Sequence, residues 1–144
     1  HVARTTTDGY LDVSTWEYWD GAAWSPDASA AADLVPAEAG VSRVLSVFEP
    51  AGAWYAVSQQ YEFIGRDITI WKAPAPQGPW TFAGAAAEIP STRSWAQYMP
   101  LAHPDLLPEP GTVVVSWSVN AMDPTLLAED PRRYRPRFAR ITLP

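Results

Sequence analysis

The side chains best placed to do chemistry in this chain are two carboxylates near its middle, Glu62 and Asp67. Glu62 closes the run Gln-Gln-Tyr-Glu at the end of a predicted strand, and Asp67 follows a Gly-Arg turn. Hydrolysis of a glycosidic bond needs an acid and a base or nucleophile roughly 5–10 Å apart. Neither residue lies in a recognisable catalytic motif, so turn capping or a solvated loop is the competing interpretation of each.

Three other residues are candidates for ligand contact. Trp95 follows a polar loop, and an indole face can stack on the apolar face of a sugar ring. His103 precedes a proline, which favours extended backbone, and Asn120 ends an apolar strand. A hydrogen-bonded structural role is the alternative for His103, and turn capping is the alternative for Asn120. With no Cys and no second internal His, the sequence does not support a zinc or EF-hand site.

Charge is concentrated near the C-terminus, where residues 132–140 hold half of the ten Lys and Arg residues. Such a cluster raises the question of nucleic acid, but a net charge of −6 opposes that function because phosphate affinity comes from a positive field. Salt bridges to acidic loops of adjacent blades are favoured instead. No apolar stretch approaches the roughly 20 residues of a membrane span, so none is predicted.

A repeat indicates the elements that must position these residues. Segments 16–24 and 71–80 each contain a strand, a Gly-containing turn and a second Trp. Repetition at a period near roughly 50 residues, with several short strands in each period, is typical of β-propeller blades. Trp24, Trp71 and Trp80 are therefore predicted to pack between blades.

The fold class predicted is all-β, a β-propeller, with the chain covering roughly two and a half blades. Residues 1–36 are predicted to end one blade, 37–90 to form one blade and 91–144 to form the last. Propellers have at least about four blades, so the chain is expected to be part of a larger one. Helical turns are predicted after Pro26-Asp27 and from 124 to 129 behind an Asp123 N-cap. Strands are predicted over 10–16, 18–19, 41–48, 54–61, 67–73, 80–83, 95–103, 113–117 and 134–143.

A series of motifs spans nearly the whole chain. In order, it consists of Trp16-x-Tyr-Trp-x-Gly-x-x-Trp24, Ile70-Trp-x-Ala-x-x-Pro-x-Gly-Pro-Trp80, His103-Pro-x-Leu106, Ser116-Trp-Ser-x-Asn120 and Tyr134-Arg-Pro-Arg-Phe138. In that order the series resembles the C-terminal half of a bacterial five-bladed propeller family of the DUF4185 type, associated with endo-D-arabinanases that cut the D-arabinan of cell-wall polysaccharides. The Trp/Gly and Gly-Pro-Trp motifs are common to many five-bladed glycosidases, whereas the later motifs are more particular.

The resemblance implies a sugar-binding groove across a central funnel, with catalytic carboxylates supplied mostly by earlier blades. It implies that His103 and Asn120 line this funnel, and that Tyr134 and Arg135 anchor the last blade or contact sugar hydroxyls. In related propellers a funnel histidine associates with a cation, often calcium, and the resemblance carries this expectation to His103. No other cofactor is implied.

The function predicted from these observations is part of a secreted glycoside hydrolase acting on arabinose-containing polysaccharide by carboxylate acid/base catalysis. The expected location is extracellular or in the cell envelope. The expected partners are a polysaccharide or oligosaccharide and the remaining blades of the parent chain, and the chain alone is expected to be inactive. The alternative is a non-catalytic carbohydrate-binding or structural propeller, in which no carboxylate pair converges.

Overall fold

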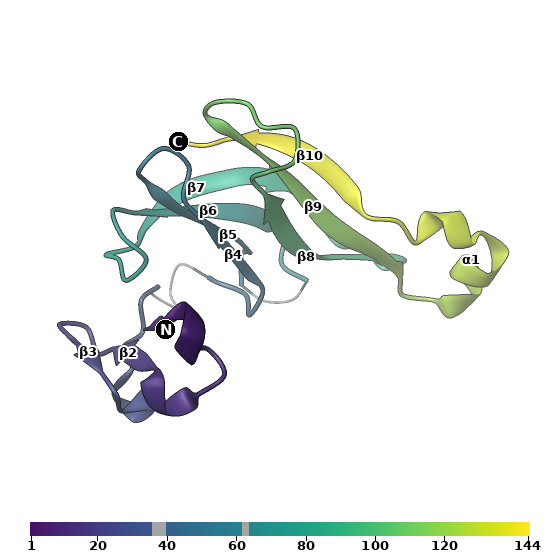
Figure 1. The fold of residues 1–144 in the computed structure, drawn as a ribbon. Coiled ribbons are helices and arrows are strands. Elements are labelled where there is room, and N and C mark those ends of the chain that lie inside the picture. The colour runs from purple at the N-terminus through teal and green to yellow at the C-terminus, as the bar shows by residue number, and fades with distance from the viewer. Residues whose placement is uncertain (36–39, 62–63) are drawn as a thin grey trace.

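The computed structural model describes residues 1–35, 40–61 and 64–144. Nearly all of its regular structure is β, in three antiparallel sheets with little helix (Figure 1). We refer to these as the N-terminal, central and C-terminal sheets. Their strands are β1 (Ala3–Arg4), β2 (Glu17–Trp19) and β3 (Trp24–Ser25); β4 (Leu45–Phe48), β5 (Trp54–Gln59), β6 (Asp67–Ala73) and β7 (Thr81–Glu88); and β8 (Trp95–His103), β9 (Thr112–Ala121) and β10 (Arg137–Thr142).

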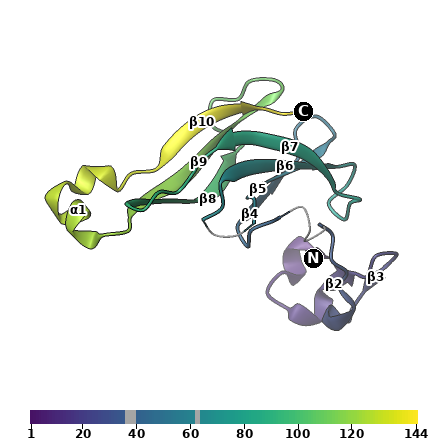
Figure 2. The same ribbon diagram turned by 180° about the vertical axis from the view of Figure 1, so that it is seen from behind.

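The N-terminal unit, residues 1–35, contains the N-terminal sheet and three 3₁₀ turns, Thr7–Gly9, Val13–Thr15 and Ala28–Ala30. Figures 1 and 2 show this unit set apart from the other two sheets. The predicted strand over 10–16 is wrong, because most of this segment forms turns. Asp12 accepts a hydrogen bond from the Ser14 amide at 3.0 Å and caps the second turn. Short polar side chains that bond to nearby backbone in this way compete with strand pairing.

The central and C-terminal sheets pack face to face and form the two-sheet body. β4–β7 are four consecutive antiparallel strands in sequence order, and the next sheet has the order β10-β9-β8. This arrangement is propeller-like. Both sheets contribute fully buried aliphatic side chains to a shared core, which explains why the run Val113–Val115 is continuously apolar. The largest cluster comprises Phe48, Tyr55, Val57, Ile68, Ile70, Ile89, Val113, Val115 and Ile141.

The opposite face of the central sheet carries a second cluster built on tryptophan. Trp71 is 1% exposed and Trp80 is 8% exposed, and both pack with Ala56 and Ala73. The prediction that these two indoles pack in the core is confirmed. Trp24 instead lies half-buried within the N-terminal unit, where its ring centroid is 5.4 Å from that of Trp19.

Two glycines that lie just before strands of the body share one conformation. Gly52 precedes β5 with φ of 84°, and Gly111 precedes β9 with φ of 72°. A Cβ at either position would meet nothing within 4 Å, so the backbone angle rather than crowding requires glycine there. The chain therefore enters β5 and β9 through turns of the same glycine conformation.

An arm, residues 122–136, projects from the C-terminal sheet between β9 and β10 (Figure 1). It carries the helix α1 (Pro124–Glu129) and the 3₁₀ turn Pro131–Arg133. Asp123 caps α1 as predicted, accepting from the Thr125 amide at 2.9 Å. β10 begins only after the arm, later than the predicted strand over 134–143. Within the part of the chain that the structure describes, no helix has the length and apolarity to cross a membrane.

Candidate functional site at the Trp95 end of the sheets

The predicted site residues lie at two opposite ends of the body. Asp67 begins β6, Trp95 begins β8 and Asn120 lies near the end of β9. Trp95 pairs with Ala121, next to Asn120, and Gln59, which pairs with Ile68, donates to the Gln97 carbonyl, so these positions share one end, which we call the Trp95 end. His103 ends β8 opposite Val114, six positions before Asn120 on β9. At the rise of a strand the two ends are therefore about 20 Å apart.

A pocket of about 400 Å³ lies at the Trp95 end. Trp95, half-buried, is fixed by the turn that precedes β8. Its amide donates to the Thr92 hydroxyl at 3.1 Å, and its carbonyl accepts from the Thr92 amide at 2.7 Å. This anchoring sets the position of the indole. The residues that line this Trp95 pocket are Thr92, Trp95, Gln97, Val119, Arg133 and Arg137.

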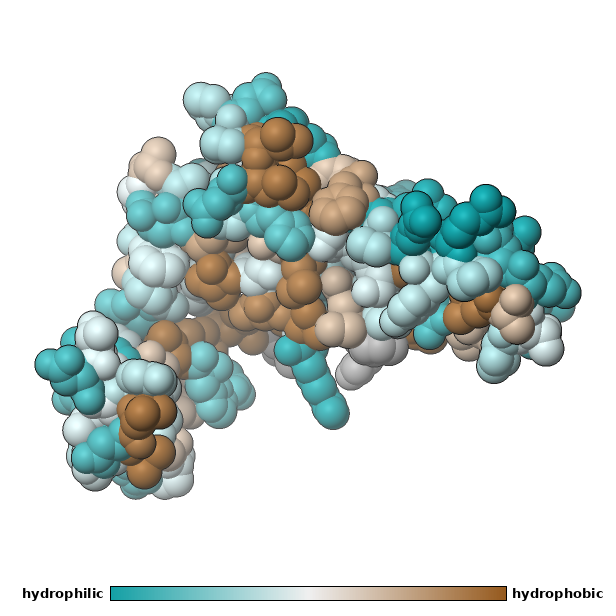
Figure 3. Space-filling model, turned by 45° about the vertical axis from the view of Figure 1, so that its right-hand side comes forward, coloured by the Kyte–Doolittle hydropathy of each residue, from teal (hydrophilic) through white to brown (hydrophobic). Residues whose placement is uncertain are grey.

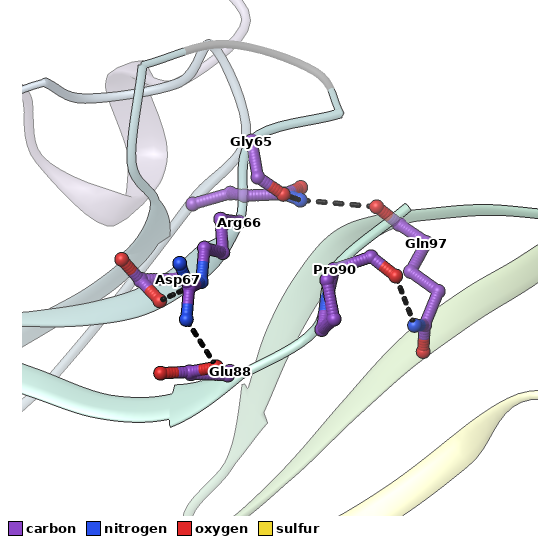
Figure 4. Close-up of polar contacts among 7 residues, drawn as sticks. Gly65, Arg66, Asp67, Glu88, Pro90 and Gln97 are labelled. Carbon is purple, nitrogen blue, oxygen red and sulfur yellow. Dashed lines mark hydrogen bonds and ion pairs between the residues drawn. The ribbon is translucent and has the colours of Figure 1, made fainter. Parts of the chain in front are cut away.

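The amide of Gln97 is a fixed part of the wall. Its Oε1 accepts from Trp117 Nε1 at 2.9 Å, and its Nε2 donates to the Pro90 carbonyl at 2.8 Å. The Gln97 carbonyl in turn accepts from Nε2 of Gln59, a fully buried residue of the central sheet, at 3.0 Å. Figure 4 shows Gln97 beside Pro90, with a dashed line from its side-chain amide to the Pro90 carbonyl. The pocket wall is thus tied to the junction of the two sheets.

Two arginines that the sequence analysis did not single out as ligand contacts also line the pocket. The Arg133 guanidinium carbon lies 5.9 Å from the Trp95 ring centroid, a cation–π distance. Arg133 Nε is 3.5 Å from Asp130 Oδ2. Arg137 begins β10 opposite Trp117, and among the described residues no carboxylate lies within ion-pair distance of its guanidinium.

The basic segment pairs with acids close to it in sequence or in the same sheet. Asp130 accepts from Arg132 Nε at 2.8 Å and also faces Arg133, and Arg140 Nε is 3.3 Å from Glu109 Oε2. The hydrogen bond from Arg132 is the largest influence that lowers the pKa of Asp130, and Arg133 adds to it. Salt bridges are present, but among the described residues they join acids in the arm or in the same sheet, whereas the predicted partners were acidic loops of adjacent blades.

On the opposite face of the C-terminal sheet, Tyr98 brings together two predicted residues, Asn120 and Tyr134. Burial, and next a hydrogen bond to Tyr134, raise the pKa of the Tyr98 phenol above its ordinary value of 10.0. A hydrogen bond from Asn120 works in the opposite direction. Asn120 Oδ1 is buried and has no hydrogen-bond partner, whereas Tyr134 is 56% exposed. Sequence reasoning missed Tyr98 because its contacts depend on the β8–β9 register.

His103 is held by protein groups at the far end of the same sheet. Its Nε2 lies 2.6 Å from the hydroxyl oxygen of Ser116, and its ring centroid is 6.1 Å from that of Phe138. Calcium takes six to eight oxygen ligands. No group of three or more His, Asp or Glu side chains that could hold a metal ion occurs among the described residues. The residues described around His103 therefore do not fit the calcium site that the resemblance implied.

Of the two predicted catalytic carboxylates, the structure describes Asp67 alone. Glu62 lies outside the described residues. Asp67 Oδ1 is 3.9 Å from Arg66 Nε, and Arg66 also bonds Glu88 Oε2 at 2.7 Å (Figure 4). The hydrogen bond to Glu88 is the largest influence that raises the pKa of Arg66. Arg135, the remaining predicted contact, is exposed and does not line the Trp95 pocket.

Comparison with known proteins shows a family and a solved structure that this chain matches. No curated protein matches this chain. A crystal structure of a presumed hydrolase from Bacteroides ovatus ATCC 8483 matches with a TM-score of 0.70 and 23% sequence identity. The match covers 96% of this chain and 38% of the Bacteroides protein, so the chain spans well under half of that protein's length. A family model described as a domain of unknown function, DUF5005, matches residues 1–143, and the chain belongs to this family.

Proposed function

We propose that this chain is the sugar-binding C-terminal part of a five-bladed propeller glycoside hydrolase. Its substrate in this proposal is an arabinose-containing polysaccharide, outside the cell or in the cell envelope. The observation that carries the proposal is the Trp95 pocket. An indole beside fixed polar and guanidinium groups offers the apolar surface and the few placed hydrogen-bonding groups that small-molecule and sugar sites use.

The propeller part of the proposal is supported by the packed antiparallel sheets and by the repeated glycine turns before β5 and β9. The division into blades at 1–36, 37–90 and 91–144, and the count of about two and a half, belong to the same proposal. The structural neighbour supports it through its fold and greater length, and its printed description as a presumed hydrolase agrees with the reaction proposed. The arabinanase-like DUF4185 type suggests the arabinose substrate.

The acid and base of hydrolysis come, in this proposal, from blades outside this chain. Among the described residues, no side chain that lines the Trp95 pocket is a carboxylate, and Asp67 faces Arg66. Glu62 and Asp67 remain the candidates that this chain could supply. In this proposal Asn120 and Tyr134 would contact sugar on the opposite face of the C-terminal sheet, and Arg135 would do so from the arm. Because His103 is about 20 Å away, only a substrate of several sugar units could touch both ends.

The test compares this chain with the longer polypeptide that the proposal requires, each incubated with arabinogalactan and arabinan. We expect both to bind in affinity electrophoresis and only the longer one to release oligosaccharide. Trp95→Ala should abolish most binding by this chain, while Trp16→Ala, in the N-terminal unit, should not. The proposal is wrong if neither polypeptide binds or cuts either polymer while a reference arabinanase releases product.

A non-catalytic carbohydrate-binding propeller is the second candidate. The engagement of Asp67 and Glu88 by Arg66 favours it, since these carboxylates serve as ion-pair partners at a sheet end. This candidate predicts binding by both polypeptides and product release by neither. Finding two acids that converge in the funnel of the longer protein would exclude it.

A further inference from the structure

The Trp95 pocket is cationic although the chain as a whole is acidic. The net charge of the chain is −6, yet the charged residues that line this pocket are two arginines. A neutral polysaccharide needs no such charge, because hydroxyl groups are recognised by neutral donors and acceptors as well. The placement of two guanidinium groups beside an aromatic ring therefore calls for a more particular ligand.

Local acids do not neutralise these arginines. Asp130 is the carboxylate paired with Arg133, and it is shared with Arg132, to which it is closer. Arg137 has no ion pair with a described residue. Arg132 and Arg133 thus share one carboxylate and Arg137 has none within ion-pair distance, so the two arginines that line the pocket keep an excess of positive charge.

The positions of the lining side chains also favour a sugar ring that carries an anionic group. The Arg133 guanidinium stands 5.9 Å from the Trp95 centroid, so a group that contacts the indole lies near a cation. The side-chain amide of Gln97 already bonds Trp117 Nε1 and the Pro90 carbonyl, so it is not free to turn toward a ligand. Thr92 and the two arginines are the remaining polar side chains of the lining. Arginine's planar fork matches a carboxylate with two parallel hydrogen bonds.

We propose that the Trp95 pocket selects a carboxylate-bearing sugar, a uronic acid residue of the polysaccharide, with Trp95 contacting the ring and Arg137 and Arg133 binding the carboxylate. This inference rests on the proposed function and deepens it by naming the sugar class that this end of the protein recognises. The recognised unit is a branch or flanking residue of the substrate, and its binding involves no covalent step.

The experiment uses the 144-residue chain and one polymer in two forms. The first is a glucuronic-acid-bearing arabinogalactan, and the second is the same polymer after carbodiimide activation and borohydride reduction of its carboxyl groups. Calorimetry and affinity electrophoresis measure binding to each. We expect the native polymer to bind roughly tenfold or more tightly than the reduced one, the scale of one charge-assisted hydrogen bond.

Variants assign that preference to the pocket. Arg137→Gln should remove most of the difference between the two polymers, and Arg133→Gln should reduce it. Arg140→Gln is the matched control, because it removes the same charge from the same strand while its side chain pairs with Glu109 away from the pocket. Thermal melting checks that each variant is folded. Arg137→Lys keeps the positive charge but loses the guanidinium fork that can form two parallel hydrogen bonds to a carboxylate.

The outcomes separate the two proposals. Equal binding of native and reduced polymer, lost in Trp95→Ala, would overturn the uronate inference and leave the proposed function standing. Equal loss in Arg137→Gln and Arg140→Gln would also overturn it, because general charge would then explain the preference. Binding to neither polymer would contradict the proposed function itself.

Discussion

The N-terminal unit and the two-sheet body are held together by different means. Within residues 1–35, Gly9 is the one residue that is buried, and the turns are capped by the side chains of Asp12, Asp20 and Asp27. The body buries two apolar clusters that contain fully inaccessible side chains such as Ile68. Capped turns define local shape but bury little area, so the body must supply most of the stability that this chain has alone.

Both regions leave apolar side chains exposed, as Figure 3 shows, and they differ in how well their interiors are filled. A hollow of about 430 Å³ lies where the two regions meet, with Trp54, Trp80 and Leu34 among its lining. The core between the central and C-terminal sheets is closed, whereas this junction is only partly filled. Changes in the body should therefore cost more than matched changes in the N-terminal unit.

The largest effect is expected from truncating the closed core. Ile68 is 0% exposed and packs between the sheets, so Ile68→Ala should lower the free energy of unfolding by about 2–5 kcal/mol. Urea denaturation followed by tryptophan fluorescence measures this loss. The matched truncation in the N-terminal unit is Leu11→Ala, 81% exposed, which should stay within about 0.5 kcal/mol of the unaltered chain. Similar losses in both variants would erase the contrast between the two regions.

The contrast between the capped turns of the N-terminal unit and the buried strands of the body also explains which strands the sequence predicted correctly. The strands 67–73 and 95–103 were predicted with the bounds observed for β6 and β8, because continuous apolar runs and flanking turns mark buried strands. The strand predicted over 10–16 is wrong because the Asp12 carboxylate accepts from both the amide and the hydroxyl of Ser14, and this local turn replaces strand pairing.

For the site, sequence pattern found residues but not their partners. Trp95 was singled out for its polar flank and does line a pocket. Arg133 and Arg137 were missed as pocket residues, and Tyr98 as the partner of Asn120 and Tyr134, because β-sheet register and the course of the arm bring them into place. His103 and Asn120 were expected in one funnel, and the strand register separates them along β9.

A smaller effect is expected where the body buries a polar side chain. Gln59 Nε2 donates to the carbonyls of Gly65 and Gln97, while its Oε1 is buried without a partner. Gln59→Leu removes a donor from both carbonyls, of which the Gln97 carbonyl keeps a 3.4 Å hydrogen bond from the Ser91 hydroxyl, and it also removes the unpaired oxygen, so a loss of about 1–3 kcal/mol is expected. Unfolding in urea measures it. Gln60→Leu, at the next and less buried position, is the control, and a neutral Gln59→Leu would show that the amide does not join the sheets.

Acid should act first on the N-terminal unit. Hydrogen bonds from Ser14, from the Ala23 and Ala22 amides, and from Ser29 lower the pKa of Asp12, Asp20 and Asp27 respectively, against an ordinary value of 3.8. Their stabilisation is complete above 3.8 and is lost as the pH falls through the lower folded-state pKa of each. Hydrogen exchange resolved by segment should therefore show the N-terminal unit opening at a higher pH than β5, β6 and β9.

The control for acid opening replaces the titrating groups without removing the caps. Asp12→Asn and Asp27→Asn keep a side-chain acceptor at each turn, so the double variant should show a weaker dependence on acid. If the body opens first, or if the double variant opens at the same pH as the unaltered chain, turn capping does not govern the N-terminal unit.

Alkali should give the smallest effect and should act on the body. The pKa of Tyr98 is raised, first by burial and then by its hydrogen bond to Tyr134, so its stabilisation is present below 10.0 and is lost as the pH rises through the higher folded-state value. Tyr98→Phe should remove this part of the alkaline loss at β8 and β9, whereas Tyr10→Phe, 60% exposed in the N-terminal unit, should not. Segment-resolved hydrogen exchange against pH reads both variants. Since the same phenol links Asn120 to Tyr134, unchanged alkaline opening in Tyr98→Phe would mean that this contact does not hold the arm to the sheet.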